Sequence, residues 1–174
     1  MSPQMIFAVQ SVCGYLAWLL CFSVYVLPRL KSMEPLKAQR AIATLHSFRF
    51  FGLVVLLPGI VGPNLPTSLT SVAGYWDLAT GVLAIITLMT VRIRPLFWLF
   101  VVVFNLVGVL DLILTYYYAV QVNLPALAGQ MGTAYVIPIL YVPVLMISHV
   151  AAIYLLVRPQ SKTVRSTGSH ATVS

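Results

Sequence analysis

The sequence predicts an all-α membrane protein: a bundle of five transmembrane helices with its N-terminus outside and its C-terminus in the cytoplasm. Three observations predict this class, namely the composition, the length of the apolar segments and the placement of the basic residues. Of the 174 residues, 60% are hydrophobic and 7% are charged, whereas soluble domains carry about 25% charged residues. A soluble domain of this composition would lack the polar side chains that its surface needs, so we expect the lipid bilayer as its surroundings.

Five apolar segments are each long enough to cross a bilayer. They span about 5–28, 41–62, 73–91, 96–119 and 134–157, so that residues 1–157 form one transmembrane domain. Each has roughly the 20 residues that a helix needs to cross about 30 Å of hydrocarbon. Residues 158–174 are polar and small, which predicts a disordered cytoplasmic tail because they have no apolar core to bury.

The first segment is expected to stay in the protein as a span, because it has no basic residues before it and is too long for a signal-peptide core. Its two cysteines, Cys13 and Cys21, would be separated by about 12 Å along one helix, which is too far for a disulfide. We therefore expect both to be buried as small hydrophobic residues.

The second segment contains a histidine and an arginine, His46 and Arg49. If the span began after Arg49, only residues 50–62 would remain, too few to cross the hydrocarbon. Both bases therefore belong inside the span. In an α-helix, His46, Arg49 and Leu53 would lie on one face.

The other segments carry a few polar residues at depth. Asp77 lies near the start of the third segment, where an acidic side chain favours a helix N-terminus. The fourth segment contains Asn105 and Asp111, and the fifth contains His149. Two prolines in the fifth segment predict a kink, because each removes a backbone donor from the helix.

The basic residues predict the orientation of the bundle. Nine of the ten Lys and Arg residues lie in the first loop, the third loop or the tail: Arg29, Lys31, Lys37, Arg40, Arg92, Arg94, Arg158, Lys162 and Arg165. With five spans, all nine fall on one side, and the positive-inside rule makes that side cytoplasmic. We expect a multi-pass protein of the cell membrane, specifically a bacterial inner membrane.

Ionisable residues inside a membrane are costly, so each one is a candidate functional residue. From the rise per residue, His46, Arg49, Asn105 and His149 lie about 8–15 Å from the cytoplasmic edge. The predicted ligand or proton site comprises His46, Arg49, Asn105, Asp111 and His149, with Asp77 and Tyr141 as secondary members. Arg49 itself has three possible partners: the lipid headgroups, a carboxylate of the bundle, or a ligand.

The first functional hypothesis is that this site binds or translocates a small ligand, an anion or a proton. An arginine beside His and Asn side chains attracts a carboxylate or phosphate, and His with Asp can relay protons. A small or lipid-like molecule is then the expected partner, besides the bilayer.

Two further hypotheses use the same residues differently. In a b-type haem carrier, His46 and His149 would be the axial ligands and haem b the cofactor; otherwise we expect no cofactor. In an assembly subunit, small-residue stripes would pack against a membrane-protein partner or a second copy of the chain. We do not expect an enzyme, a metal site or a nucleic-acid partner, because the sequence has no motif for any of them.

Overall fold

The computed structural model describes residues 1–158, and its regular structure in that range is entirely helical. The predicted tail, 158–174, lies outside the described residues apart from Arg158. In chain order the elements are α1 (Pro3–Cys21), the π-helical turn η1 (Phe22–Val26), α2 (Leu27–Ser32), α3 (Pro35–His46), the 3-10 helix η2 (Ser47–Leu56), α4 (Thr67–Met89), α5 (Arg94–Gln121), the 3-10 helix η3 (Leu124–Tyr135), the π-helical turn η4 (Ile137–Tyr141) and α6 (Val142–Val157).

Four helical stretches are long and apolar enough to cross a membrane. They are Pro3–Ser32, which joins α1, η1 and α2; Thr67–Met89, which is α4; Arg94–Gln121, which is α5; and Ile137–Val157, which joins η4 and α6. These stretches correspond to the first, third, fourth and fifth predicted segments. The all-helical fold is therefore confirmed, and four of the five segments have the length and composition of membrane spans.

The second predicted segment, 41–62, differs from a simple helix. Helix α3 begins earlier, at Pro35, and gives way after His46 to the 3-10 helix η2, which ends at Leu56. A 3-10 helix has three residues per turn, and the buried residues of η2 follow that spacing: Arg49, Gly52 and Val55. The prediction that Leu53 lies on the same helix face as Arg49 is therefore wrong, because the tighter winding brings Gly52 onto that face instead.

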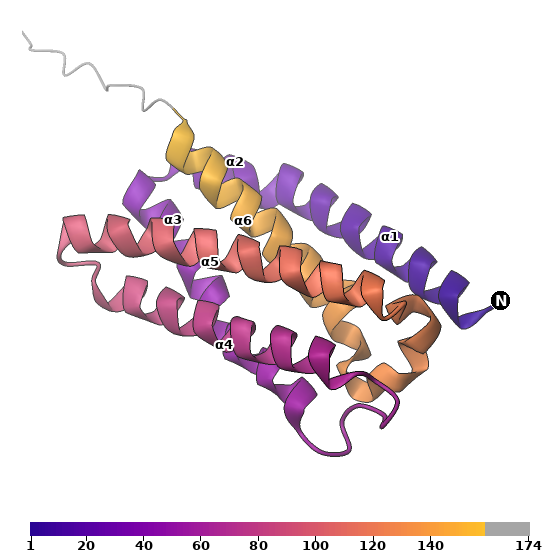
Figure 1. Cartoon of the computed structure of the whole chain (residues 1–174). Coiled ribbons are helices and arrows are strands. Elements are labelled where there is room, and N and C mark those ends of the chain that lie inside the picture. Colours follow the sequence, from indigo (N-terminus) through magenta and orange to yellow (C-terminus); the bar gives the residue numbers. More distant parts are fainter. Residues whose placement is uncertain (159–174) are drawn as a thin grey trace, which may run out of the picture.

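The exposed basic residues gather at one end of the bundle, which we call the basic end (Figure 1). Those described are Arg29, Lys31, Lys37, Arg40, Arg92, Arg94 and Arg158, and all seven are exposed. Two contacts join distant segments there: the Lys31 ammonium lies 4.9 Å from the centre of the Tyr154 ring, and the Gln39 amide donates to the carbonyl of Ala152 at 2.9 Å. Residue 1 lies at the opposite end, the N-terminal end.

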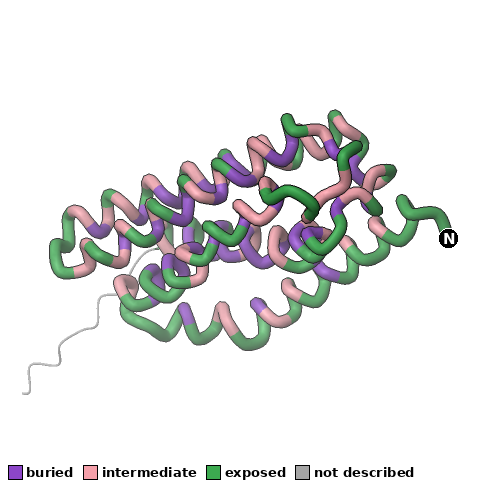
Figure 2. Tube along the Cα trace, turned by 90° about the horizontal axis from the view of Figure 1, so that it is seen from below, coloured by how far each residue is buried: buried purple, intermediate pink, exposed green. Residues whose placement is uncertain are grey.

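Helix α1 packs loosely on the rest of the bundle. Gly14 is its only buried residue, and a β-carbon there would clash with the carbonyl oxygen of Ile139. Figure 2 shows the exposed class along most of this helix. Cys13 is exposed and Cys21 is half-buried, so the expectation that both cysteines are buried is wrong. Because most of the helix lies outside the protein core, its apolar side chains are available to lipid.

Two apolar clusters lie on either side of the polar interior. The cluster toward the basic end includes the buried residues Leu30, Ala38, Ile42, Phe97, Val101 and Ala152. The cluster toward the N-terminal end is formed by Val55, Leu65, Leu69, Leu124, Met131, Ala134 and Ile137. Between them lie buried polar side chains from five elements, α3, η2, α4, α5 and α6: His46, Arg49, Asp77, Asn105, Asp111, Ser148 and His149. We call these side chains the polar layer. It lies between the two apolar clusters, away from both ends of the bundle.

Candidate functional site

Arg49 lies at the centre of the polar layer and is 1% exposed. Its Nε donates to Oδ1 of Asp77, on α4, at 2.6 Å, and its Nη2 forms a second ion pair with Asp111, on α5. Of the three partners expected for Arg49, the structure therefore selects the carboxylates, and it engages both of them. The guanidinium does not extend toward the basic end.

Gly52 makes room for the first of these ion pairs. A β-carbon at Gly52 would clash with the carboxylate of Asp77, so only glycine lets η2 approach α4 this closely. The 3-10 winding places Gly52 directly next to Arg49 on the buried face. The ion pair between Arg49 and Asp77 thus depends on the 3-10 winding of η2, which places Gly52 where the Asp77 carboxylate needs space.

The position of Asp77 corrects one expectation. Because α4 begins at Thr67 rather than near residue 73, Asp77 lies in the body of the helix and not at its N-terminus. A favourable interaction with the helix dipole acts only within the first turn. Asp77 therefore owes its stabilisation to Arg49 rather than to the end of the helix.

His149, on α6, is the third partner of Arg49. Its Nε2 lies 3.2 Å from Arg49 Nη1, and its Nδ1 lies 2.9 Å from Oδ1 of Asn105. A guanidinium only donates, so Nε2 accepts and the ring proton resides on Nδ1, which donates to Asn105. The Asn105 amide in turn donates to the carbonyl of Val101 at 2.8 Å. This chain of donors and acceptors defines His149 as a neutral imidazole of one tautomer.

Gly108 leaves room for the His149 ring, as Gly52 does for the Asp77 carboxylate. A β-carbon at Gly108, on α5, would clash with Nε2 of His149. We call Arg49, Asp77, Asp111 and His149 the Arg49 cluster. Two of its members thus occupy space that glycine leaves free.

His46 adjoins the Arg49 cluster on the side of the basic end. Its ring stacks on that of His149 with 3.9 Å between the centroids, and its Nε2 lies 3.0 Å from Oγ of Ser148. The Ser148 hydroxyl donates its proton to the carbonyl of Leu145, so His46 Nε2 is the donor to Ser148. His46 Nδ1 is then a bare acceptor, and it has no hydrogen-bond partner among the described residues.

The charges of the Arg49 cluster do not balance when both carboxylates are ionised. One guanidinium faces two carboxylates, and the hydrogen bonds of His149 make it neutral. An uncompensated charge in a buried site is costly. One additional proton makes the cluster neutral, and two carboxylates that share a site behave as a coupled pair that holds such a proton jointly.

The structure brings together all five residues of the predicted site, together with Asp77. Tyr141, the other secondary candidate, packs its ring edge-on against Phe51 with 6.4 Å between the centroids, and its hydroxyl has no hydrogen-bond partner among the described residues. Sequence reasoning did not single out Ser148, Gly52 or Gly108. Ser148 is adjacent to His149 in the chain, but nothing in the sequence marks the two glycines as positions of close approach.

The geometry of the two histidines does not fit a haem held between them. Axial imidazoles must direct a ring nitrogen at the same iron from opposite sides. Here the rings contact each other with 3.9 Å between their centroids and 36° between their planes, His149 Nε2 faces Arg49, and His46 Nε2 faces Ser148. A bis-histidine haem would require both side chains to leave these contacts.

Comparison with known proteins assigns the chain to a family. A family model described as "Domain of unknown function (DUF8737)" matches residues 6–157, which includes every helix that contributes to the polar layer. No curated protein and no solved structure matches the chain. The chain therefore belongs to the family of that domain.

Proposed function

We propose that this protein crosses the membrane five times and carries protons through it by way of the Arg49 cluster. The observation that carries the proposal is the unequal charge of the cluster, in which one guanidinium serves two buried carboxylates. A buried site of this kind binds one proton to become neutral and releases it only against the cost of an isolated negative charge. Proton uptake and release are then the chemistry that the cluster performs.

In addition to the four long apolar stretches, α3 and η2 together form a span, the second in chain order. Twelve residues of α-helix and ten of 3-10 helix together extend for about 38 Å, enough to cross a hydrocarbon core of about 30 Å. The seven exposed basic residues within 1–158 then lie on one side, which the positive-inside rule assigns to the cytoplasm. The N-terminal end of the bundle faces outward.

An anion is a poorer candidate than a proton for this site. The Arg49 guanidinium already pairs with two carboxylates and also contacts His149. A carboxylate or phosphate ligand would therefore enter a site whose net charge is zero or negative. Electrostatic repulsion from Asp77 and Asp111 disfavours this.

Polar groups lie on both sides of the cluster and provide a path for the proton. Toward the cytoplasm, Gln39 and His46 are seven residues apart and share the buried face of α3. Gln39 Oε1 and His46 Nδ1 are buried acceptors without a partner among the described residues. Toward the outside, Thr115 donates to Oδ1 of Asp111 at 3.2 Å.

Infrared spectroscopy tests directly whether one carboxyl group of the Arg49 cluster is protonated. The purified protein should show the carbonyl absorption of a protonated carboxyl group in an apolar environment. We expect this band to disappear in both Asp111→Asn and Asp77→Asn, because Arg49 then neutralises the single remaining carboxylate. Both variants keep the side-chain shape and a neutral cluster, so they should fold. Glu34→Gln removes an exposed carboxylate at the basic end and should leave the band unchanged.

Transport is measured in vesicles that contain a pH-sensitive dye. The wild-type protein should accelerate the decay of an imposed pH gradient, and Asp111→Asn should slow that decay to the rate of protein-free vesicles. Glu34→Gln should retain the wild-type rate. If Asp111→Asn conducts protons as fast as the wild type does, the proposal is wrong.

A further inference from the structure

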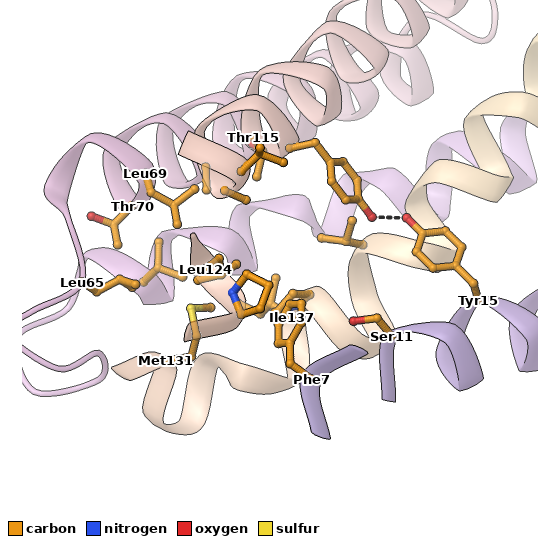
Figure 3. Close-up of a pocket in the computed structure, with 18 residues that line it drawn as sticks. Phe7, Ser11, Tyr15, Leu65, Leu69, Thr70, Thr115, Leu124, Met131 and Ile137 are labelled. Atoms are coloured by element: carbon orange, nitrogen blue, oxygen red, sulfur yellow. Dashed lines mark hydrogen bonds between the residues drawn. The ribbon is translucent and has the colours of Figure 1, made fainter. Parts of the chain in front are cut away.

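A cavity of about 320 Å³ lies in the half of the bundle toward the N-terminal end, next to the Arg49 cluster. Figure 3 shows its walls, which come from α1, η2, α4, α5, η3, η4 and α6 and from Leu65 in the loop before α4. Its volume falls within the range of about 300–1,000 Å³ that is typical of small-molecule sites. Apolar cavities about half as large already bind small hydrocarbons.

The side chains in the wall define what the cavity accepts. Most are aliphatic or aromatic, and none is charged; examples are Phe7, Val55, Leu69, Leu124, Met131 and Ile137. Asp111 lies immediately behind the wall, because Thr115 both lines the cavity and donates to the carboxylate. Because no charged side chain lines the wall, an ion of either sign would lose its hydration there without gaining a counter-charge. The wall selects a neutral molecule.

Five hydroxyl-bearing side chains line the wall, namely Ser11, Tyr15, Thr70, Thr115 and Tyr116, and Thr115 is the one that contacts the Arg49 cluster. The Thr115 hydroxyl proton is used by Asp111, so its oxygen is left as an acceptor. The hydroxyls of Tyr15 and Tyr116 hydrogen-bond to each other across the gap between α1 and α5, which Figure 3 shows at the edge of the cavity. A ligand with a single hydroxyl group can donate to Thr115 while the rest of it contacts apolar side chains.

The loops at the N-terminal end close the cavity on that side. Leu124, Pro125 and Met131 of η3 line it there, together with Leu65 in the loop before α4. The backbone N–H of Gly62 donates to the carbonyl of Gln130 at 2.7 Å, which joins the loop before α4 to η3. A molecule with a large charged headgroup could not place that group above the cavity.

The side of the cavity is more open than its end. Val120 lines it and is 75% exposed, and Tyr116 beside it is also exposed. Both lie on α5 opposite α1, the helix with the least buried surface. In the proposed topology this opening faces the hydrocarbon of the outer leaflet, so a ligand would enter laterally from the lipid.

We infer that this cavity binds a neutral, chain-like alcohol without a bulky headgroup, which enters from the outer leaflet beside Val120, clear of the hydrogen bond that joins Tyr15 to Tyr116. The inference uses the membrane topology proposed above but not the proton chemistry of the Arg49 cluster. Its essential elements are the uncharged wall, the acceptor oxygen of Thr115, the closed end and the lateral opening. Each of these is independent of whether the cluster moves protons.

Photochemical labelling in phosphatidylcholine vesicles tests the inference. One sample contains a long-chain alcohol that carries a diazirine, and the other contains phosphatidylcholine with a diazirine in its acyl chain. Peptide mapping should place the alcohol label on the cavity-lining parts of α4 and α5, and excess unlabelled long-chain alcohol should remove it. The phospholipid probe should label lipid-facing residues without that competition.

Two variants make the test specific. The double variant Ala73→Leu/Ala119→Leu adds side-chain volume at two cavity positions and should lower alcohol labelling there by about tenfold, because filled space is not available to the ligand. Leu106→Phe adds volume at a lipid-facing position of α5 and should leave the labelling unchanged. Equal labelling in the filled variant, or competitive labelling of the cavity by phosphatidylcholine, would overturn the inference.

Discussion

The first and second helical segments of this chain differ in how much of their surface is buried inside the protein. Helix α1 is apolar around most of its circumference, yet it buries only Gly14 in the protein. The segment formed by α3 and η2 contains His46 and Arg49, yet it buries one residue in almost every turn. Between these two segments, the one with the buried polar residues is the one that packs inside the protein. Four predictions test how far this difference extends.

Replacement of the central cation should have the largest effect. Arg49→Met leaves Asp77 and Asp111 buried without a cation, and removing one partner of a buried ion pair costs about 3–5 kcal/mol. Unfolding in mixed micelles, followed by circular dichroism, measures the loss. Arg40→Met, at an exposed position of α3, is the matched control and should unfold like the wild type. Equal stability of the two variants would show that the ion pairs do not hold η2 in place.

A single methyl group at the closest backbone approach should have the next largest effect. Gly52→Ala places a β-carbon where the Asp77 carboxylate lies, and overpacking of this kind costs about 1–3 kcal/mol. Gly129→Ala is the control, because a β-carbon there has no heavy atom within 4 Å. Thermal unfolding of both variants in the same detergent compares them. A wild-type melting temperature for Gly52→Ala would contradict the close packing of η2 on α4.

Loss of a hydrogen bond at the edge of the cluster should have a smaller effect. Thr115→Val keeps the shape of the side chain but removes its donor to Asp111, at a cost of about 0.5–1.5 kcal/mol. Chemical unfolding measures the change, with Thr44→Val as the control, since Thr44 is exposed and bonds only within its own helix. If the two variants lose the same stability, Asp111 gains nothing specific from Thr115.

A truncation on the lipid-facing helix should have the smallest effect. Leu16 is 54% exposed on α1, and Leu16→Ala should change the free energy of unfolding by no more than about 0.5 kcal/mol. The same micelle unfolding experiment measures it. Leu145→Ala, at a position of α6 that is 1% exposed, should cost about 2–5 kcal/mol. A large loss for Leu16→Ala would mean that α1 packs against protein rather than lipid.

The sequence predicted the helical class and the residues of the polar layer other than Ser148, because both follow from simple limits. A span needs about 20 residues, which forced Arg49 inside the second segment. The basic loops then predicted which end of each segment is cytoplasmic. Counted from those ends, His46, Asn105 and His149 were expected to lie at similar depth. Depth depends only on position along each helix, which residue spacing gives directly.

The rotation of each helix could not be predicted in the same way. The partners of Arg49 depend on the 3-10 winding of η2, which replaces Leu53 with Gly52 on the buried face. Nothing in the apolar pattern of residues 47–56 distinguishes that winding from an α-helix. The start of α4 at Thr67 was also missed, because the Ser and Thr residues of its first turn are typical of a loop.

The sequence separation within the Arg49 cluster has a consequence for how the chain is made. The residues that pair with Arg49 follow it by 28 and 62 positions, so the arginine emerges from the ribosome well before either carboxylate. During that interval an inserted second segment would hold an unpaired charge in lipid, which is unfavourable. The second segment is therefore expected to enter the bilayer together with the α4–α5 hairpin, after the synthesis of Asp111, rather than in the order in which it is translated.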